Sequence, residues 1–499
     1  MNNSQRVSVL LLGTALCVAG CGGSDNNGTF GSPTSGTSGS SSTGSTTGSG
    51  SSSGSGSTTG NGTTTGSGST TSSGGTTTAA ASCSAMLAAG APTISTQPAD
   101  QTIASGQHAL FHVVATGATR YQWCQNGSAI SGATSSTYYS GALTATDAGD
   151  SFTVVVGNAA GSMVSNAAMV HVNPNSDGSP PASFWGNTAA LPKATKVMTF
   201  SFVNATNGKY PDSQIYWSIQ GQTSASTGKT PISEVHSIAE VPTFDMPDAA
   251  SARMYFFVAP TSTTPPFPQN NTSYYDFIEF NIGPTNTAGV WNFNGDTTRV
   301  DAFGLKTAIH LHCTDPAATD VQRGEDYGTF LEDRAITFLK YQAETPTQFI
   351  GTVQYAPYRI TEPGASGFKS GGPEAAYYNS YIDEVWANNN IDVTKVPKPT
   401  PFLSFASNAQ TDLSAAMERH VAHTAGTFNP DGTLVNKAFW STISSSTFYS
   451  AAPANYYAQY WHTHGIAGKA YGFPYDDVGG YSSDIGCNSP QYLVVAIGW

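Results

Sequence analysis

The sequence predicts a multidomain chain in which an all-β sandwich precedes a larger β-rich domain that ends in a mixed α/β part. The 499 residues exceed the length of one ordinary domain. Only 10% of residues are charged, 11% are aromatic and 53 are glycine, which is typical of extracellular β-rich domains with a Gly-rich linker. Hydrophobic periodicity changes from short alternating runs to helical spacing after about residue 325.

Residues 1–20 read as a signal peptide. Arg6 supplies a positive charge, and residues 7–18 form an apolar run that is too short to span a bilayer. Val18-Ala19-Gly20-Cys21 resembles a bacterial lipobox, which implies cleavage before Cys21 and lipidation of its thiol. We therefore expect a membrane-anchored lipoprotein of the cell envelope that faces outward from the outer membrane or cell surface, with release as an alternative. An ordinary secretory signal with an incidental cysteine is the other interpretation.

Residues 21–82 are almost entirely Gly, Ser, Thr and Asn, so we expect a flexible tether without a core. Four cysteines follow it outside the cytoplasm, and four thiols allow three pairings. We favour Cys313–Cys487, because both lie in the C-terminal module. Cys83 would then pair with Cys124.

Residues 90–173 carry short alternating runs punctuated by Gly, Asn and Asp, a pattern typical of a β-sandwich. The module resembles bacterial immunoglobulin-like domains, with Trp123 at the place of the core tryptophan. Val113 and Val154 stand where such domains can carry a disulfide, so apolar packing is expected there. We interpret the module as a spacer, and the aromatics Tyr138 and Tyr139 as the one hint of glycan binding.

Residues 173–181 (NPNSDGSPP) predict a short hinge, and residues 183–499 form the main domain. Its first part, to about Cys313, reads as strands separated by Pro- and Gly-rich turns. Its second part alternates strands with helices expected at Glu325–Ala343, Glu374–Asn388, Thr411–His423 and Asn455–His464, and the closing QYLVVAIGW reads as a buried strand. We expect a cleft between the two parts.

Two segments of this domain each place a carboxylate beside aromatic residues. In YYDFIEFNI, Ile278 and Phe280 face the core, and Glu279 faces the other side with Tyr275 and Phe277. TRVDAF reads as a second strand, in which Asp301 shares a face with arginine and phenylalanine. Two carboxylates in different surroundings suit acid–base work on a sugar, because one can stay protonated while the other stays ionised.

These segments, with AYGFPYDDVGGYSSDIGCNSPQYLVVAIGW at the end of the chain, resemble family 64 of the glycoside hydrolases. The motifs that carry the resemblance are D-F-I-E-F, V-D-A-F-G-L and Y-D-D-V. The resemblance implies a thaumatin-like β-sandwich or barrel with a mixed α/β subdomain forming a cleft. It also implies an inverting endo-β-1,3-glucanase that releases short oligosaccharides.

By the same motifs, Glu279 matches the family's general acid and Asp301 its general base. Asp276 competes with Glu279, but it alternates to the core face and is expected to pair with a donor. Asp296 competes with Asp301, but Asn294-Gly295-Asp296 is a turn signature. The gap between Glu279 and Asp301 is longer than we expect for the family, so Gly283–Gly289 reads as an inserted loop.

Further side chains are expected to bind substrate around the two acids. Tryptophan offers a stacking face for sugar, and asparagine, threonine and acidic residues offer hydroxyl partners. The expected residues are Trp291, Asn294, Thr297, Thr298, Tyr475, Asp476 and Asp477. Trp291 could equally be a core residue, and the Tyr-Asp-Asp motif could equally be a turn with a salt bridge.

Several function classes lack support. The net charge of −13 argues against a nucleic-acid partner but is compatible with a neutral glycan. No C-x-x-C motif is present, and His310 and His312 share a strand face without a third ligand in view, so we expect no metal or cofactor. Gly364-Ala365-Ser366-Gly367 is not the nucleophile elbow of serine hydrolases.

The sequence therefore predicts a lipid-anchored, monomeric β-1,3-glucanase that acts on β-1,3-glucan. The main alternative is a non-catalytic glucan-binding or adhesion lipoprotein that uses the same cleft.

Overall fold

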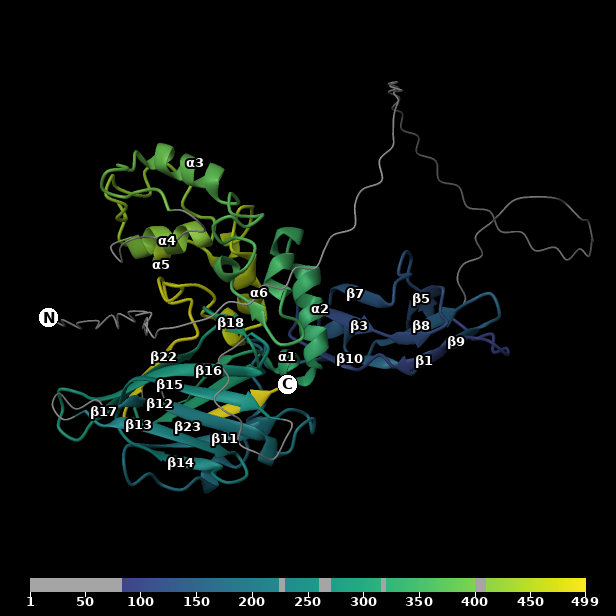
Figure 1. Cartoon of the computed structure of the whole chain (residues 1–499), viewed down its shortest axis with the longest axis horizontal. Helices are drawn as coiled ribbons and strands as arrows, with labels where there is room; N and C mark the ends of the chain where they lie inside the picture. The colour runs from purple at the N-terminus through teal and green to yellow at the C-terminus, as the bar shows by residue number, and fades with distance from the viewer. Residues whose placement is uncertain (1–82, 224–228, 260–270, 316–319, 400–409) are drawn as a thin grey trace, which may run out of the picture. The chain divides into compact units, whose positions relative to one another are not determined.

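The computed structural model describes residues 83–223, 229–259, 271–315, 320–399 and 410–499 (Figure 1). All described residues belong to one compact unit, residues 79–499. The expected signal peptide, the lipidated Cys21 and the tether to residue 82 lie outside the described residues. No helix within the described ranges is long and apolar enough to cross a membrane.

The first described part is a small β-sandwich. One sheet has the order β2-β10-β8-β5-β6 with β9 beside β8, and two short pairs, β1-β4 and β3-β7, complete it. The bounds are β1 Thr93–Thr96, β2 Gln101–Ile103, β3 His108–His112, β4 Val114–Thr116, β5 Arg120–Gln125, β6 Ser128–Ala129, β7 Thr137–Ala142, β8 Ser151–Gly157, β9 Ser162–Val164 and β10 Ala168–Val172.

The core of this sandwich forms around Trp123, which is fully buried, as expected. Val113 and Val154 are buried in the same cluster. Cys83 pairs with Cys124 on β5, which ties the start of the described chain to the sandwich. The relation of this module to immunoglobulin-like domains stays a prediction.

Tyr138 and Tyr139 on β7 are not the exposed aromatics that the sequence suggested. The Tyr138 ring stacks on Trp123 at 6.1 Å between centroids. The Tyr139 ring stacks on His108 at 4.8 Å, and its hydroxyl hydrogen-bonds to Glu344 of the following domain. Both rings therefore have structural partners, and β3 packs against the helix that carries Glu344 (Figure 1).

The expected hinge at residues 173–181 is also bound to the main domain. The main-chain N–H of Tyr327 donates to the carbonyl oxygen of Gly178 at 2.9 Å, and that of Ala467 donates to Asp177 at 2.6 Å. Gln107 of the sandwich donates through Nε2 to the Asp326 carboxylate at 2.6 Å. Hydrogen bonds therefore hold this segment to the main domain, whereas its Gly- and Pro-rich sequence predicts a hinge.

Two larger sheets form the body of the main domain. A six-stranded sheet has the order β13-β12-β15-β16-β17-β22, and a five-stranded sheet has the order β14-β11-β23-β19-β20, in which β11 and β23 run parallel. The bounds are β11 Met198–Ala205, β12 Ile215–Gln222, β13 Pro231–Ser237, β14 Thr243–Met246, β15 Ala249–Val258, β16 Tyr275–Pro284, β17 Trp291–Thr297, β19 Lys306–Cys313, β20 Asp320–Gly324, β22 Ile485–Asn488 and β23 Pro490–Gly498.

The two sheets share one hydrophobic core. Ile278, Phe280 and Ile282 of β16 point into it, as the period-two pattern predicted. The opposite face of the six-stranded sheet is thereby left free for other side chains. Cys313 on β19 is disulfide-bonded to Cys487 on β22, the pairing favoured from the sequence, and this bond joins the two sheets.

The second half of the domain adds helices and a pair of two-residue strands. The bounds are α1 Tyr327–Leu331, α2 Arg334–Glu344, α3 Asn379–Asn389, α4 Thr411–Glu418, α5 Phe439–Thr442, α6 Tyr456–Thr463, β18 Ala302–Phe303 and β21 Ile360–Thr361. The single helix expected at Glu325–Ala343 is two helices, because Asp326 and Asp333 each accept a main-chain N–H as an N-cap and so begin separate helices. The helix expected from Glu374 begins at Asn379.

The segment that carries Asp301 departs from the expected strand. Thr298–Asp301 is irregular, and the neighbouring strand β18 has two residues. Arg299 turns inward instead of sharing an outer face with Asp301, because it pairs with buried carboxylates. The turn expected at Asn294-Gly295-Asp296 is also wrong, since all three residues lie inside β17, where β16 and β22 pair on either side.

Candidate active site

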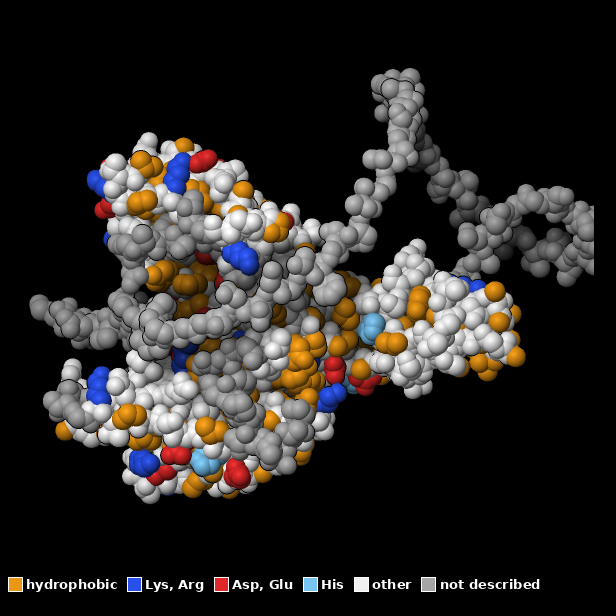
Figure 2. All heavy atoms as spheres, in the orientation of Figure 1, with side chains coloured by type: hydrophobic (Ala, Val, Ile, Leu, Met, Phe, Trp, Pro, Cys, Tyr) orange, Lys and Arg blue, Asp and Glu red, His pale blue; other side chains and the backbone are white. Residues whose placement is uncertain are grey.

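Three strands place one row of charged side chains on the outer face of the six-stranded sheet. Arg253 on β15 is the cross-strand partner of Glu279 on β16, and Glu279 is the partner of Asp296 on β17. Directly paired residues of antiparallel strands project to the same side. The row therefore lies on the face opposite the Ile278 and Phe280 core. Figure 2 shows the surface hollowed between this sheet and the part that carries α3, α4 and α5, with hydrophobic and acidic side chains inside.

Glu279 is a largely buried carboxyl with one strong partner. Its side chain is 14% exposed, and its Oε1 accepts from Arg253 Nε at 2.5 Å. Burial raises the pKa of Glu279, and the nearby charge of Asp301 raises it further, although Arg253 acts in the opposite direction. A carboxyl that keeps its proton to higher pH than usual suits a general acid.

Asp301 is exposed and lies in the bend between β17 and β18. Its main-chain carbonyl accepts from the N–H of Glu362 at 3.1 Å, which fixes the bend against β21. Its charge raises the pKa of Glu279, of Tyr275 and of Glu362. An exposed carboxylate near a buried carboxyl is the arrangement that activation of water requires.

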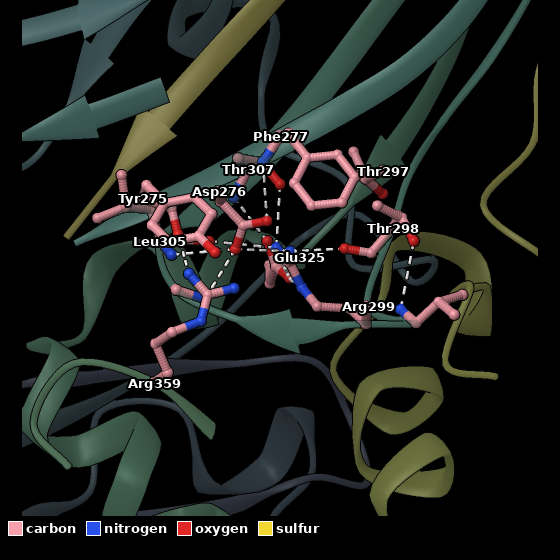
Figure 3. Close-up of polar contacts among 12 residues, drawn as sticks. Tyr275, Asp276, Phe277, Thr297, Thr298, Arg299, Leu305, Thr307, Glu325 and Arg359 are labelled. Atoms are coloured by element: carbon pink, nitrogen blue, oxygen red, sulfur yellow. Dashed lines mark hydrogen bonds and ion pairs between the residues drawn. The ribbon is translucent and has the colours of Figure 1, made fainter. Parts of the chain in front are cut away.

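A buried ion network holds the segment that carries Asp301 (Figure 3). Arg299 Nη1 lies 2.9 Å from Asp276 Oδ2, and Arg299 Nη2 lies 2.5 Å from Glu325 Oε1. The exposed fractions of these side chains are 2%, 0% and 5%. Asp276 also accepts from the main-chain N–H groups of Gly304 at 2.8 Å and Leu305 at 3.1 Å. Asp276 therefore pairs with donors, as expected, and is no rival to Glu279.

The main chain of Arg299 is also hydrogen-bonded, through both its N–H and its carbonyl. Its N–H donates to the carbonyl of Tyr471 at 2.7 Å, and its carbonyl accepts from the hydroxyl of Tyr457 on α6 at 2.7 Å. On the other side of Asp276, Arg359 Nη1 donates to the carbonyl of Tyr275 at 2.9 Å, and the guanidinium carbon of Arg359 lies 4.0 Å from the centroid of the Tyr275 ring. Contacts from α6 and from β16 thus set the position of Asp301 two residues away.

Glu362 is a third carboxyl near the pair that the sequence did not single out. It follows β21, and its Oε2 accepts from the N–H of Gly364 at 2.5 Å. Burial raises the pKa of Glu362 to about 7, and the charge of Asp301 acts in the same direction. Glu362-Pro363-Gly364 reads locally as a turn, so no sequence signal pointed to the site.

The residues expected to bind substrate differ in how far they are exposed. Asn294, Tyr475 and Asp477 retain exposed surface, and Asn294 Nδ2 donates to Asp484 at 2.9 Å. Trp291 is partly buried against the core, in line with its interpretation as a packing residue. The other three, Thr297, Thr298 and Asp476, are buried to 4%, 3% and 0% exposure.

The buried carboxylate of Asp476 is bonded to three groups of the main domain. Arg419 Nη2 lies 2.8 Å from its Oδ1, and His462 Nε2 lies 3.0 Å from its Oδ2. The N–H of Gly472 also donates to it at 2.8 Å. Asp476 therefore fits the salt-bridge interpretation of the Tyr-Asp-Asp motif, and the adjacent Asp477 faces solvent.

His310 and His312 share a carboxylate partner. His310 and His312 both contact Asp320 Oδ1, at 2.9 and 3.0 Å. Within the ranges that the structure describes, no group of three His, Cys, Asp or Glu side chains is placed to hold a metal ion.

Comparison with known proteins identifies the family. The chain matches the sequence profile of the β-1,3-glucanases of glycoside hydrolase family 64 over residues 200–398 and 389–497, which is more than half of its length. None of the curated proteins compared with the chain matches it.

Two family 64 enzymes are among the solved structures similar to the chain. One is a family 64 laminaripentaose-producing β-1,3-glucanase from Paenibacillus barengoltzii, at 24% identity and a TM-score of 0.48, over 81% of this chain and 99% of that one. The other is a β-1,3-glucanase domain from Clostridium beijerinckii, at 21% identity and a TM-score of 0.46, over 62% of this chain and 100% of that one. On the profile match, the chain belongs to the β-1,3-glucanases of glycoside hydrolase family 64.

Proposed function

We propose that the protein is an inverting endo-β-1,3-glucanase that cuts linear β-1,3-glucans such as curdlan or laminarin into short oligosaccharides. One observation carries the proposal: Glu279 is a largely buried carboxyl on the outer face of the sheet, and the exposed Asp301 in the bend after β17 is near enough for its charge to raise the pKa of Glu279. Family membership supports β-1,3-glucan as the substrate.

In the proposed reaction Glu279 donates its proton to the glycosidic oxygen as the bond to the anomeric carbon breaks. Asp301 takes a proton from a water molecule, whose oxygen attacks the same carbon from the opposite side. Inverting enzymes hold their two carboxyls about 6.5–9.5 Å apart to leave room for this water. The raised pKa that burial gives Glu279 and the exposure of Asp301 support this division of roles.

We further propose that the enzyme acts outside the cell as an anchored, monomeric lipoprotein. The lipobox-like sequence that ends at Cys21 and the Gly/Ser/Thr-rich residues 21–82 support this arrangement. Two or three acyl chains on Cys21 would hold the protein at a membrane, and the tether would let the catalytic domain reach an insoluble glucan.

The test is release of reducing sugar from curdlan by the full chain, beside Glu279→Gln and Asp301→Asn. Both variants should lose activity by about 10²-fold or more, since general acid–base catalysis contributes at least that much. Asp383→Asn is the matched control, because Asp383 is 67% exposed and pairs with Lys398 on the helical part. If the wild-type protein binds curdlan without releasing sugar, it is a glucan-binding protein, and the enzymatic proposal is wrong.

A further inference from the structure

Asp296 is a carboxyl of the site that the acid–base scheme does not use. It lies directly opposite Glu279 in the β16–β17 register. Side chains at such paired positions have Cβ atoms about 4.5–5.5 Å apart, close enough for two carboxyls to share a hydrogen bond. On its other side Glu279 faces Arg253, so Glu279 stands between one cation and one acid.

One carboxylate oxygen of Asp296 is buried without a hydrogen-bond partner among the described residues. The residue is 8% exposed, and the inaccessible oxygen is Oδ1. An ionised carboxylate in such a place is costly unless a donor or a cation stabilises it. A protonated carboxyl at this position avoids that cost.

The charges that face Asp296 also favour its protonated form. Glu279 on β16, Asp484 ahead of β22 and Asp477 are all acidic, and Arg253 is the cation that acts on it from β15. Arg253 is already ion-paired with Glu279. Burial raises the pKa of Asp296 well above its ordinary value, and the neighbouring carboxylates add to that effect.

Tyr471 is the remaining titratable group that senses Asp296. Burial raises the pKa of its hydroxyl, and the negative charges of Asp477 and Asp296 raise it further. The tyrosine therefore stays neutral, and its hydroxyl donates to Asp477 Oδ1 at 3.4 Å.

We propose that Asp296 and Glu279 form a carboxyl dyad that holds one proton between them, with Asp296 as a positioning residue that keeps a proton available to the general acid. The proposal rests on the acid–base function proposed above. With one proton the dyad has a single negative charge, which Arg253 neutralises. Loss of that proton would place two negative charges side by side in a buried site, so the proton stays bound to higher pH than on Glu279 alone.

The dyad explains how Glu279 can act as an acid while its Oε1 is bonded to an arginine. The guanidinium of Arg253 lowers the pKa of Glu279, against the effect of burial. With Asp296 beside it, the shared proton can reside on Glu279 when the substrate arrives. That proton passes to the glycosidic oxygen as the carbon–oxygen bond breaks, and the proton that Asp301 takes from water returns to the dyad through solvent.

The test is the pH dependence of kcat/KM on soluble laminarin for the full chain and its variants. Asp296→Asn preserves shape but removes the second carboxyl, and its amide can donate to Glu279. The basic limb of the profile should therefore move to lower pH by about one unit or more, a tenfold change in proton affinity. Asp296→Glu should restore the limb toward its original place. Asp383→Asn removes an exposed carboxylate on α3 and should leave the basic limb unchanged.

The outcomes separate this inference from the proposed function. If Glu279→Gln is inactive but Asp296→Asn keeps the basic limb of the wild-type enzyme, the dyad is wrong and the general acid stands. A lower kcat with an unmoved limb likewise marks Asp296 as merely structural. If Glu279→Gln stays active, the assigned acid fails, and the dyad fails with it. Asp296→Ser repeats the comparison with a second side chain that cannot titrate in this range.

Discussion

Replacing Arg299 by methionine should strongly destabilise the main domain. The change keeps much of the side-chain volume but removes the cation between Asp276 and Glu325, whose side chains are 0% and 5% exposed. Two carboxylates would then face each other in the interior without the guanidinium. Breaking a buried ion pair from one side costs about 3–5 kcal/mol, because the remaining charge is uncompensated.

The thermal midpoint of Arg299→Met should fall by on the order of 10 °C, given about 2–4 °C per kcal/mol for a large domain. Circular dichroism melting of the full chain measures this shift. Arg120→Met is the matched control, because Arg120 is exposed on the sandwich and should cost little.

A second substitution tests whether charge is the cause. Arg299→Met combined with Glu325→Gln removes one of the two stranded carboxylates and should recover part of the lost stability. If the double variant is no more stable than Arg299→Met, lost packing explains the effect. The reasoning that the ion network fixes the Asp301 segment would then be refuted.

Three further predictions follow from the same contacts. Arg253→Met should move the basic limb of the pH–activity profile to higher pH, because the guanidinium that lowers the pKa of Glu279 is gone. This shift is opposite to the one expected for Asp296→Asn. An unmoved limb would contradict the role of Arg253. A chain that begins at Ser183 should have a lower thermal midpoint than the full chain, because the hydrogen bonds from Gln107 to Asp326 and from Tyr327 to the Gly178 carbonyl are lost. Equal thermal midpoints would show that the sandwich is a mere spacer. Cys313→Ala with Cys487→Ala should lower the free energy of unfolding by roughly 2–4 kcal/mol, and a denaturant titration that shows no change would argue against this cross-link as a stabilising element.

Local periodicity was sufficient for β16, the strand that carries Glu279. Alternation in β16 placed Ile278 and Phe280 in the core, Glu279 on the outer face and Asp276 inside with a donor, and the structure agrees on each point. The reason is physical: a strand packed on one side must alternate its side chains, and that pattern is visible in nine residues.

The errors came where distant residues decide the local conformation. Arg299 was placed on an outer face because its partners Asp276 and Glu325 lie 23 and 26 residues away along the chain. Asp296 was interpreted as a turn residue because Asn-Gly-Asp is a turn signal locally, yet pairing with β16 and β22 overrides it. Glu362 lies near the site because β21 pairs with β18, and no pattern in the sequence predicts that pairing.

The stereochemistry of the first product tests the central claim most directly. Proton NMR of laminarin during the first minutes of hydrolysis resolves the anomeric signal of new reducing ends before they mutarotate. Water activated by Asp301 and attacking opposite a leaving group protonated by Glu279 predicts that the α-anomer appears first. Initial release of the β-anomer would mean a covalent intermediate and a second displacement, and it would contradict the roles assigned to these two carboxyls.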